Sequence, residues 1–390
     1  MSSVKPSVLI VTPFFKPNVG GVETRFNEIT KALGKEGIKT HVLTFQPLIT
    51  PGVRGERYEQ DGNISIYRKQ WVGFNLFHKL LKFQVLEFLY LAIPVLWNSF
   101  WFLLFKKGKL NIKTVHAAGL NATLALVLIK PLFKFRLVSS THALYDFKKG
   151  AFFTKIISWM FSRVDLVLAV GEVSKKEIEK IGIDPKKVVV QPTWVNQDIF
   201  KMLDSEKCKE ELGLKGKFVV GFIGRLNENK GVKLIFNLVD RFRDEKDVVF
   251  VFVGTGELDS LVKKEAEEKD NVYYFGKIDN YKLGKYYNAL DIYLAPSLYS
   301  EGFARAVVEA LSCGIPVLAA NGGHLPEIVT KDVGWIIEPT KENFYKNLKE
   351  IIKNKDSLRI MRSNCAKVAR KRFNPDRITE IIDSYKLCVE

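Results

Sequence analysis

The feature that most constrains the fold is an alternation of two kinds of segment along the whole chain. Short runs rich in β-branched residues are separated by longer stretches whose apolar residues recur at helical spacing. Strands joined through helices pair in parallel, because each crossover returns the chain to the same end of the sheet. We therefore expect an α/β fold of doubly wound parallel sheets.

The predicted strands fall into two series, one in each half of the chain. In the first half they lie near Val8, Thr40, Ile64, Ile112, Leu137, Leu166 and Val188. In the second half they lie at residues 218–223, 248–253, 272–275, 292–295, 315–319 and 334–337. A chain of 390 residues is long for one core. We predict two Rossmann-like domains, residues 1–192 and 193–372, joined by the Pro-containing connection at residues 191–198.

The positive charge is concentrated in the N-terminal half. Residues 1–200 carry 28 Lys and Arg against 14 Asp and Glu, while the rest of the chain carries 32 against 29. Such a field suits an anionic partner, either nucleic acid or a membrane surface. Because the charges are interleaved with apolar and aromatic residues, we favour an anionic membrane surface and expect no nucleic acid.

Residues 71–109 carry most of this aromatic and basic character, and residues 147–163 repeat it. The apolar run is long enough to cross a bilayer. If the strands near residues 8–12 and 111–116 share one sheet, however, both ends of the run must lie on one side. We therefore expect an interfacial helix or helical pair, with lysines near anionic lipid. These are Lys79, Lys82, Lys106, Lys107 and Lys109.

The cysteines and the N-terminus predict the compartment. The four cysteines have neither metal-ligand nor disulfide-like spacing. Residues 1–6 lead directly into an apolar strand, without the design of a signal peptide. We expect a cytoplasmic protein attached peripherally to the cytoplasmic face of the membrane.

Two glutamates, Glu301 and Glu309, stand eight positions apart around the turn into a predicted helix. A helix beginning at about Phe303 would place Glu309 on its second turn and Glu301 just before its N-terminus. Backbone N–H groups at a helix N-terminus attract anions, and carboxylates accept hydrogen bonds from vicinal hydroxyls. The arrangement suits a phosphorylated sugar.

Residues 297–317 resemble the Glu-x7-Glu signature of retaining GT-B glycosyltransferases, the family that includes glycogen synthases and phosphatidylinositol mannosyltransferases. Residues 13–24 look like the glycine loop of that family, and residues 221–231 look like the opening of its second domain. Five shorter segments match in the expected order, at residues 115–118, 140–143, 253–257, 275–278 and 291–297. Single short motifs often match by chance, whereas an ordered series over nearly the whole chain seldom does.

The resemblance implies a GT-B fold, in which two Rossmann-like domains face each other across a cleft. It implies that the N-terminal domain binds the acceptor and the C-terminal domain binds the nucleotide sugar. It also implies that the last helix, within residues 373–390, packs back on the first domain.

The resemblance also assigns residues to the donor. Arg225 and Lys230, which follow a predicted strand, would grip the donor diphosphate. Glu301 would bind sugar hydroxyls and Glu309 the ribose, although Arg305 could simply pair with Glu309. The helix end formed by Gly302, Phe303 and Ala304 would face phosphate oxygens. Gly276 and Ile278 would lie near the nucleobase, and Gly20 and Gly21 would let the backbone approach the pyrophosphate.

The catalytic residues predicted in this way are His142, Arg225, Lys230 and Glu301. His142 would face the donor sugar, with His116 as a second choice. A lone histidine is more often structural, and paired glycines are more often a tight turn. The implied reaction transfers a hexose from a UDP- or GDP-linked donor to an acceptor hydroxyl with retained configuration. The departing diphosphate would take the acceptor proton, so neither a protein nucleophile nor a metal or other cofactor is expected.

Three hypotheses follow. The favoured one is a membrane-associated glycosyltransferase that acts on a lipid-linked or glycan acceptor. The second is a soluble glucan or sugar-phosphate transferase, or a nucleotide-sugar epimerase, of the same fold. The third is a noncatalytic basic module for membrane or nucleic acid, which would leave Arg225, Lys230 and the two glutamates without a role.

Overall fold

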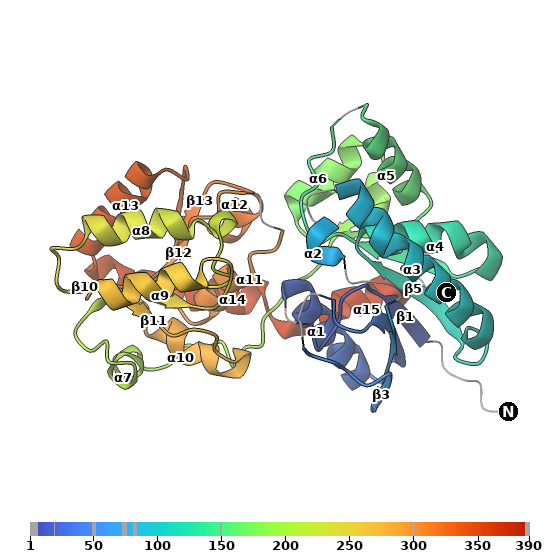
Figure 1. Cartoon of the computed structure of the whole chain (residues 1–390), viewed down its shortest axis with the longest axis horizontal. Coiled ribbons are helices and arrows are strands. Elements are labelled where there is room, and N and C mark those ends of the chain that lie inside the picture. Colours follow the sequence, from blue (N-terminus) through green and yellow to red (C-terminus); the bar gives the residue numbers. More distant parts are fainter. Residues whose placement is uncertain are drawn as a thin grey trace. The chain divides into compact units, whose positions relative to one another are not determined.

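The chain forms two compact units in a computed structural model (Figure 1). The structure describes residues 7–18, 20–48, 52–71, 76–80, 84–148, 150–299 and 302–386, apart from the side chains of residues 78, 84 and 386. The first unit comprises Met1–Pro192 and Ile378–Glu390, and the second comprises Thr193–Arg377. The chain therefore leaves the first unit once and returns to it for its last helix.

The first unit is built on an eight-stranded sheet of order β3-β4-β2-β1-β5-β6-β7-β8. All neighbouring strands pair in parallel except β3 and β4, which pair antiparallel. The strands are β1 (Ser7–Val11), β2 (Thr40–Phe45), β3 (Tyr58–Asp61), β4 (Ile64–Lys69), β5 (Ile112–Ala118), β6 (Arg136–Ser140), β7 (Leu166–Ala169) and β8 (Val188–Val190). The seven strands predicted for this half are all present. The eighth, β3, is a polar edge strand, so it lacked the apolar pattern that marked the others.

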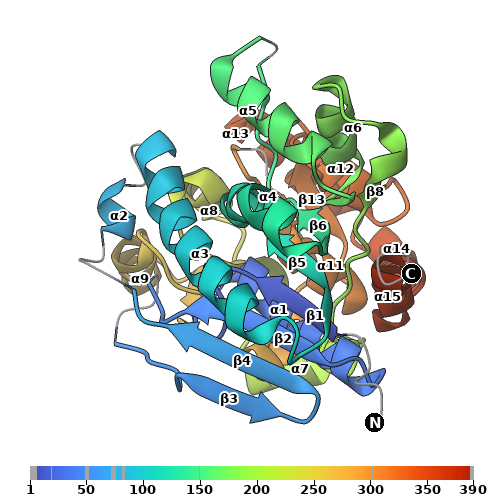
Figure 2. The same cartoon turned by 90° about the vertical axis from the view of Figure 1, so that its right-hand side faces the viewer.

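Helices cover both faces of this sheet (Figure 2). They are α1 (Gly21–Lys35), α2 (Phe77–Leu80), α3 (Gln84–Lys106), α4 (Leu120–Phe133), α5 (Phe152–Ser162), α6 (Glu172–Lys180), the 3-10 turn η1 (Pro185–Lys187) and α15 (Ile378–Lys386). The core between sheet and helices is built mainly from the aliphatic strand residues, such as Leu9, Val115 and Leu137, each fully buried. A doubly wound parallel sheet is confirmed for this unit.

The second unit has a six-stranded, fully parallel sheet of order β11-β10-β9-β12-β13-β14. Its strands are β9 (Phe218–Ile223), β10 (Val248–Val253), β11 (Val272–Tyr274), β12 (Ile292–Ala295), β13 (Val317–Ala320) and β14 (Gly334–Ile337). Its helices are α7 (Ser205–Glu211), α8 (Val232–Arg241), α9 (Asp259–Glu268), α10 (Leu283–Asn288), α11 (Arg305–Ser312), α12 (Leu325–Ile328), α13 (Lys341–Lys353) and α14 (Asp356–Arg372), with 3-10 turns η2 (Glu228–Lys230), η3 (Asn280–Lys282) and η4 (Pro375–Arg377). The six strands predicted for this half are all present.

The second unit extends to Arg377, beyond the predicted end at residue 372. Phe373 is buried in its core and packs edge-on against Phe303, with ring centroids 6.1 Å apart. The carbonyl of Phe373 also accepts a hydrogen bond from Gln197 of the same unit. The last helix, α15, begins at Ile378, within the predicted residues 373–390.

Candidate functional site

The loops that follow β9, β10 and β11 are joined by backbone hydrogen bonds. The Gly224 amide donates to the Val253 carbonyl at 2.9 Å, and the Leu226 amide to the Thr255 carbonyl at 3.0 Å. The Gly254 amide in turn donates to the Gly276 carbonyl at 2.8 Å. Because the strands are parallel, these loops all leave the same edge of the sheet, which we call the carboxyl edge of the second unit. Open α/β sheets bind ligands at this edge.

Glycines make this close approach possible. Gly254 has φ 132°, and a Cβ there would lie 1.9 Å from the Gly224 carbonyl oxygen. A Cβ at Gly256 would lie 2.3 Å from the Leu226 carbonyl oxygen. The glycines of residues 253–257 therefore allow the β10 loop to lie against the β9 loop. This packing role was not evident from the sequence motif.

The loop after β12 is fixed to the β9 loop in the same way. The Leu298 amide donates to the Asn229 carbonyl at 2.9 Å. Gly231 has φ 75°, and a Cβ there would lie 2.2 Å from the Pro296 carbonyl oxygen. Four loops thus meet at the carboxyl edge and bring together segments that lie far apart in the chain.

Arg225 and Lys230 lie on the β9 loop. The Arg225 side chain is exposed, and Lys230 is half-buried in η2, where its amide donates to the Asn227 side chain at 3.0 Å. Gly276, with φ 65°, and the half-buried Ile278 lie on the loop after β11, at the same edge. The structure therefore gathers these four predicted residues on neighbouring loops of the carboxyl edge. Their contacts with a donor stay predictions.

The helix after the glutamate motif begins later than expected. It starts at Arg305 rather than at about Phe303, because the Arg305 amide donates back to the Phe303 carbonyl at 2.9 Å in a turn before the helix. Gly302 and Phe303 are half-buried, and the buried Ala304 is the N-cap, which makes no side-chain capping bond. Glu301 lies outside the described residues.

Glu309 is on the second turn of α11, as expected, but it is buried, with 5% of its surface exposed. Its Oε1 accepts a hydrogen bond from Arg305 Nε at 2.8 Å, which confirms the pairing considered from the sequence. Its Oε2 accepts one from the Tyr287 hydroxyl of α10 at 2.9 Å. Burial, together with the neighbouring Glu309 carboxylate, raises the pKa of Tyr287 well above its ordinary value, so this hydroxyl remains a donor.

Tyr287 was not found from the sequence. Its ring is fully buried and packs against Phe200 and Tyr293, as the ring of an ordinary core aromatic does. No sequence signal separates a tyrosine that orients a carboxylate from one that fills space. The Glu309 carboxylate is thus held in place from two helices, α10 and α11.

Gly20 and Gly21 stand at the start of α1, where Gly20 is the N-cap. A Cβ on Gly20 would lie 2.3 Å from Glu23 Oε2, so the Glu23 carboxylate rests against this glycine. Glu23 is buried, in the first turn of the helix. The protein therefore places a carboxylate of its own beside the predicted pyrophosphate contact. A phosphate at Gly20 and Gly21 stays a prediction, and it requires Glu23 to turn away.

His142 follows β6 and is half-buried. Its Nε2 lies 3.3 Å from the Ser140 hydroxyl, and its ring packs edge-on against Phe26 of α1 at 5.5 Å between centroids. Burial, and then the nearby Arg25 and His116, lower the pKa of His142 to about 3. The imidazole is therefore neutral at pH 7. It can exchange hydrogen bonds with a sugar hydroxyl but carries no positive charge.

His116 is unsuited to the second-choice role. It lies within β5 rather than in the loop after it, and it is fully buried. Its Nδ1 shares a short hydrogen bond with the Tyr385 hydroxyl of α15. His116 therefore contributes to holding α15 in place through Tyr385. Of the two candidate histidines, only His142 lies beyond the end of its strand.

The loop that follows His142 is held by α6, which no sequence motif singled out. The Glu177 carboxylate accepts hydrogen bonds from the amides of Tyr145 and Phe147 at 3.1–3.2 Å. The Ser174 hydroxyl donates to the Ala143 carbonyl at 3.2 Å. Two side chains of one helix thus fix the path of the chain beyond His142.

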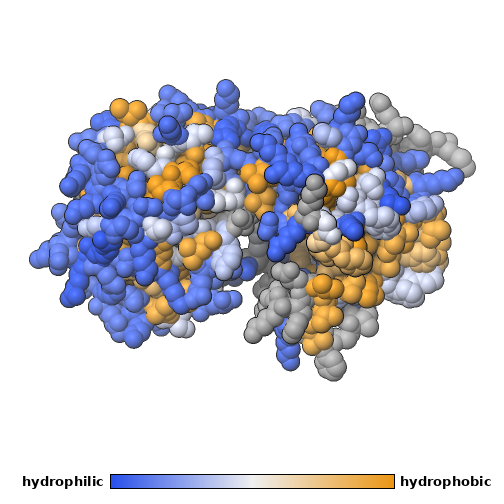
Figure 3. Space-filling view, turned by 90° about the horizontal axis from the view of Figure 1, so that it is seen from above, coloured by the Kyte–Doolittle hydropathy of each residue, from blue (hydrophilic) through white to orange (hydrophobic). Residues whose placement is uncertain are grey.

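Exposed apolar side chains gather on one face of the first unit (Figure 3). We call it the apolar face, and it consists of Val85, Leu86, Leu89, Ile93, Trp97, Trp101, Leu104 and Phe105 on α3 with Phe152, Phe153 and Trp159 on α5. The two helices are in contact, since Phe153 packs edge-on against Phe88 at 5.7 Å. The α3 members recur mainly every four residues, so they form one stripe along the helix.

The opposite side of α3 belongs to the core. Phe88, Val95, Phe102 and Leu103 are buried there, in the cluster that includes residues of α4. By length and composition, residues 85–106 could cross a membrane, but about a third of that stretch is buried within the protein. Among the predicted lysines, Lys79 and Lys109 are exposed, and Lys106 lies 4.6 Å from the Tyr67 ring centroid. Lys82 lies outside the described residues.

In the described part of the chain, no three His, Cys, Asp or Glu side chains gather as a metal site would require. Cys208, Cys313 and Cys365 are buried free thiols there. Burial raises the pKa of Cys365 to about 12, so that thiol is protonated.

Two family models match the chain, one in each half. Residues 204–372 match the model described as "Glycosyl transferases group 1", and residues 19–199 match "Glycosyltransferase Family 4". The first match covers the carboxyl edge with its four loops. The second covers the apolar face, His142 and the start of α1.

Curated relatives are similar over most of their length. A phosphatidylinositol N-acetylglucosaminyltransferase component of Arabidopsis thaliana is 23% identical over 89% of this chain and 74% of that protein. An uncharacterized glycosyltransferase of Methanocaldococcus jannaschii is 24% identical over 95% of each chain.

Solved structures share the fold. Sucrose-phosphate synthase from Thermosynechococcus elongatus has a TM-score of 0.79 at 18% identity over 98% of both chains. HepE of Anabaena, in complex with UDP, has a TM-score of 0.75 at 20% identity over 97% of this chain and 99% of its own. The predicted GT-B fold class, with two parallel-sheet α/β domains, is confirmed by these likenesses.

Proposed function

Because this chain is a glycosyltransferase with a Family 4 half and a group 1 half, we propose that it is a retaining hexosyltransferase. It moves a hexose from a UDP- or GDP-linked donor to an acceptor hydroxyl on a lipid-linked or membrane glycan. The observation that carries the proposal is the carboxyl edge of the second unit, where four joined loops hold Arg225, Lys230 and Gly276 beside the segment that enters α11. The Anabaena neighbour was solved with UDP and with UDP-glucose, which supports a nucleotide-sugar donor.

The donor diphosphate takes up charge as the glycosidic bond breaks. Arg225 and Lys230 stabilise it with charge-assisted hydrogen bonds, and the N-terminal amides of α11 add to the positive potential. Glu309 binds the ribose while Tyr287 and Arg305 keep its carboxylate in one orientation. Glu301 binds hydroxyls of the transferred sugar. The nucleobase lies over Gly276 and Ile278.

The step exchanges one bond for another at the anomeric carbon. The bond from that carbon to the diphosphate oxygen breaks, and a bond to the acceptor oxygen forms on the same face of the sugar. The acceptor proton passes to the departing phosphate oxygen, so atoms and charge balance without a protein nucleophile. Neutral His142 donates to or accepts from a sugar hydroxyl and orients the ring.

Membrane attachment belongs to the same proposal. The apolar face exposes two tryptophans and a phenylalanine along one side of α3, while the other side of that helix is fixed in the core. Apolar patches of this kind mark sites of membrane or partner binding. Aromatic and aliphatic side chains would enter the headgroup region, with Lys79 and Lys109 beside anionic lipid. The Arabidopsis relative is named for a phosphatidylinositol substrate, which supports a lipid acceptor.

The release of nucleoside diphosphate from a panel of UDP- and GDP-sugars, in the presence of a total lipid extract, tests the proposal. Arg225→Ala removes an exposed cation from the carboxyl edge, and Arg243→Ala removes an exposed arginine elsewhere in the unit. We expect Arg225→Ala to lower the rate by roughly 10²–10³-fold and Arg243→Ala to leave it unchanged. Equal rates in the two variants, or no release from any donor by wild type, would overturn the proposal. NMR of the product's anomeric proton tests retention.

A further inference from the structure

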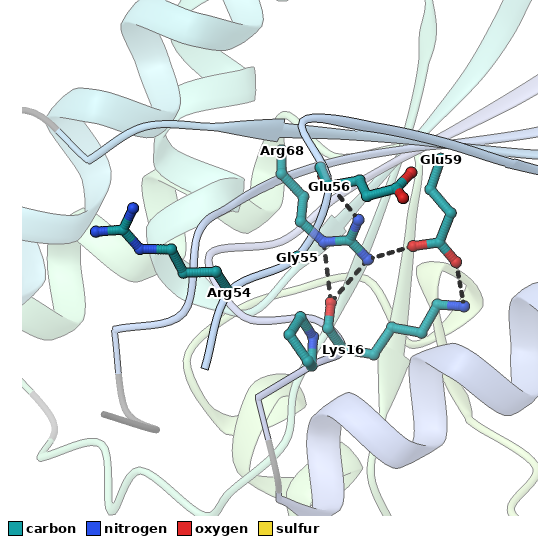
Figure 4. A pocket seen from close by; sticks show the side chains of 7 residues that line it. Lys16, Arg54, Gly55, Glu56, Glu59 and Arg68 are labelled. Atoms are coloured by element: carbon teal, nitrogen blue, oxygen red, sulfur yellow. Dashed lines mark hydrogen bonds and ion pairs between the residues drawn. The ribbon is translucent and has the colours of Figure 1, made fainter. Parts of the chain in front are cut away.

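A polar pocket lies at one edge of the first unit, and none of the residues assigned to the donor lines it (Figure 4). It has a volume of about 470 Å³, within the range of about 300–1,000 Å³ typical of small-molecule sites. Its lining comes from four segments, the loop after β1, the loop between β2 and β3, the strand β3 and the end of β4. The lining residues are Lys16, Pro17, Arg54, Gly55, Glu56, Glu59 and Arg68.

One wall of the pocket is a rigid ionic cluster. The Arg68 side chain is buried, and its guanidinium donates to the carbonyls of Lys16 and Glu56 and to Glu59 Oε2 at 2.8–3.1 Å. Lys16 Nζ donates to Glu59 Oε1 at 2.8 Å. Burial tends to raise the pKa of Glu59, but the hydrogen bonds from Lys16 and Arg68 lower it below its ordinary value. The carboxylate therefore stays ionised between two cations.

A second wall is formed by residues 54–56, whose backbone is held by hydrogen bonds and close packing. The Gln46 side chain bonds both backbone groups of Gly55, donating to its carbonyl at 2.8 Å and accepting from its amide at 3.0 Å. A Cβ on Gly55 would lie 2.7 Å from Arg68 Nε, so only glycine lets the loop lie on the guanidinium. Residues 54–56 are thus preorganised, which lowers the entropic cost of binding.

Two charged side chains of this loop remain available to a ligand. Arg54 and Glu56 are exposed, and neither side chain makes a hydrogen bond or ion pair within the described residues. Figure 4 shows the Arg54 guanidinium extending away from the Arg68 and Glu59 pair. Lys16 keeps two further ammonium protons after it has bonded Glu59. Cations outnumber carboxylates in the lining, so the pocket favours an anion, and Glu56 adds an acceptor for hydroxyl groups.

The loop after β1 connects this pocket to the rest of the proposed site. Phe14 of that loop packs edge-on against Phe77 of α2 at 5.3 Å, in the cluster that also holds Leu91 of α3. Lys16 lines the pocket, and Gly20 of the same loop begins α1. One short segment therefore packs in the cluster that holds Leu91 of α3, lines the pocket and leads to the predicted pyrophosphate contact.

We infer that this pocket binds the phosphorylated, hydroxyl-rich head of the acceptor. The phosphate takes hydrogen bonds from Lys16 and from Arg54, whose exposed side chain must first turn over the pocket (Figure 4), and Glu56 accepts from hydroxyls of the sugar or polyol. That this ligand is the acceptor rests on the proposed function. That it is phosphorylated and rich in hydroxyls follows from the lining residues. The same head group could come from a free sugar phosphate or from a glycolipid phosphate.

Titration calorimetry on the full chain tests the ligand class, with glucose 1-phosphate as the probe and glucose as its uncharged counterpart. Arg54→Gln removes the available cation, and Arg57→Gln removes an exposed arginine of the same loop that does not line the pocket. We expect wild type and Arg57→Gln to bind glucose 1-phosphate more tightly than glucose, and Arg54→Gln to lose about tenfold or more of that affinity. Equal loss in both variants, or no preference for the phosphate, would overturn the pocket.

Vesicle sedimentation distinguishes the two sources. Phosphatidylinositol and phosphatidylserine carry the same single net charge, and only the first has a polyol head. If the ligand is a lipid head, Arg54→Gln weakens binding to phosphatidylinositol vesicles and not to phosphatidylserine vesicles. If the ligand is a free sugar phosphate, both vesicle affinities stay at the wild-type value while glucose 1-phosphate binding falls. Either result supports the pocket, and unchanged binding in both assays contradicts it.

The measurements distinguish an error in the pocket inference from an error in the proposed function. Donor binding, followed as thermal protection by UDP and GDP, should be the same in Arg54→Gln as in wild type, because Arg54 is not among the residues assigned to the donor. Donor protection with no phosphate binding would refute the pocket alone. Phosphate binding with no donor protection in wild type would refute the transferase proposal and leave an anion site.

Discussion

Replacement of one exposed isoleucine of the apolar face by alanine should weaken membrane binding measurably. Ile93 lies in the middle of the α3 stripe with 62% of its surface exposed. Full burial of an isoleucine side chain is worth about 1.5–3 kcal/mol, so the exposed part of Ile93 contributes about 1–2 kcal/mol on entering lipid. Ile93→Ala should therefore bind vesicles roughly 5- to 30-fold more weakly.

The chain offers a matched control on the other unit. Ile360 on α14 is 73% exposed, so it has the same side chain and at least the same exposure, but it lies outside the apolar face. Ile360→Ala should bind vesicles as wild type does. The assay is partition of the full chain onto vesicles with about 30% anionic lipid, where lysines near the surface add about 1 kcal/mol each. Because both side chains are exposed, neither change should shift the unfolding midpoint measurably.

The reasoning fails if Ile93→Ala and Ile360→Ala partition equally. It also fails if wild type stays in solution at low salt, where attraction to anionic lipid is strongest. A loss in Ile93→Ala accompanied by a lower unfolding midpoint would instead place Ile93 in the core, contrary to its exposure.

Three further predictions concern stability. Tyr287→Phe removes a hydrogen bond to the buried Glu309 carboxylate and should lower the free energy of unfolding in urea by about 1.5–3 kcal/mol. Tyr293→Phe should cost less, because the Tyr293 hydroxyl donates to the neutral Ile223 carbonyl. Equal costs would contradict this prediction. Gly231→Ala and Gly216→Ala both place alanine at φ 75°, but only the first meets a carbonyl oxygen, at 2.2 Å, so it should be worse by about 1–3 kcal/mol in the same assay. Burial lowers the pKa of His116 from 6.5 to about 3, so below pH 6.5 the unfolded chain binds a proton that the folded chain does not bind. By pH 5 this difference should lower the free energy of unfolding by about 2 kcal/mol. His116→Gln should therefore lose less stability than wild type between pH 7.5 and pH 5.

The sequence predicted the sheets well because their strands are apolar on both faces. Thirteen predicted strand positions correspond to strands of the two parallel sheets, and buried parallel strands carry a strong local signal. The strand Tyr58–Asp61 was missed because it is an exposed edge strand, whose pairing depends on the following strand rather than on its own pattern. The start of α11 was placed early, since a turn at Phe303 and a helix share the same local composition.

The site was harder to predict because much of it depends on contacts that are distant in sequence. Arg225 and Gly276 could be chosen from motifs, but the backbone bonds that join their loops could not. The burial of Glu309 and its bond to Tyr287 follow from the packing of α10 on α11. The role of His116 as an anchor for Tyr385 joins residues 269 positions apart. The pocket at Arg68 likewise needs segments from residues 16 to 68 to come together.

Thermal protection by nucleoside diphosphates and nucleotide sugars is the most direct test of the central claim, that the carboxyl edge of the second unit binds a nucleotide-sugar donor. The samples are wild type, Arg225→Ala and Arg243→Ala, each with ligand at about 100 times its dissociation constant for wild type, where the gain approaches about 2.7 kcal/mol. We predict that ligands of one nucleobase raise the unfolding midpoint of wild type and Arg243→Ala, and raise that of Arg225→Ala far less. No shift with any nucleotide, or an equal shift in Arg225→Ala, would contradict the claim.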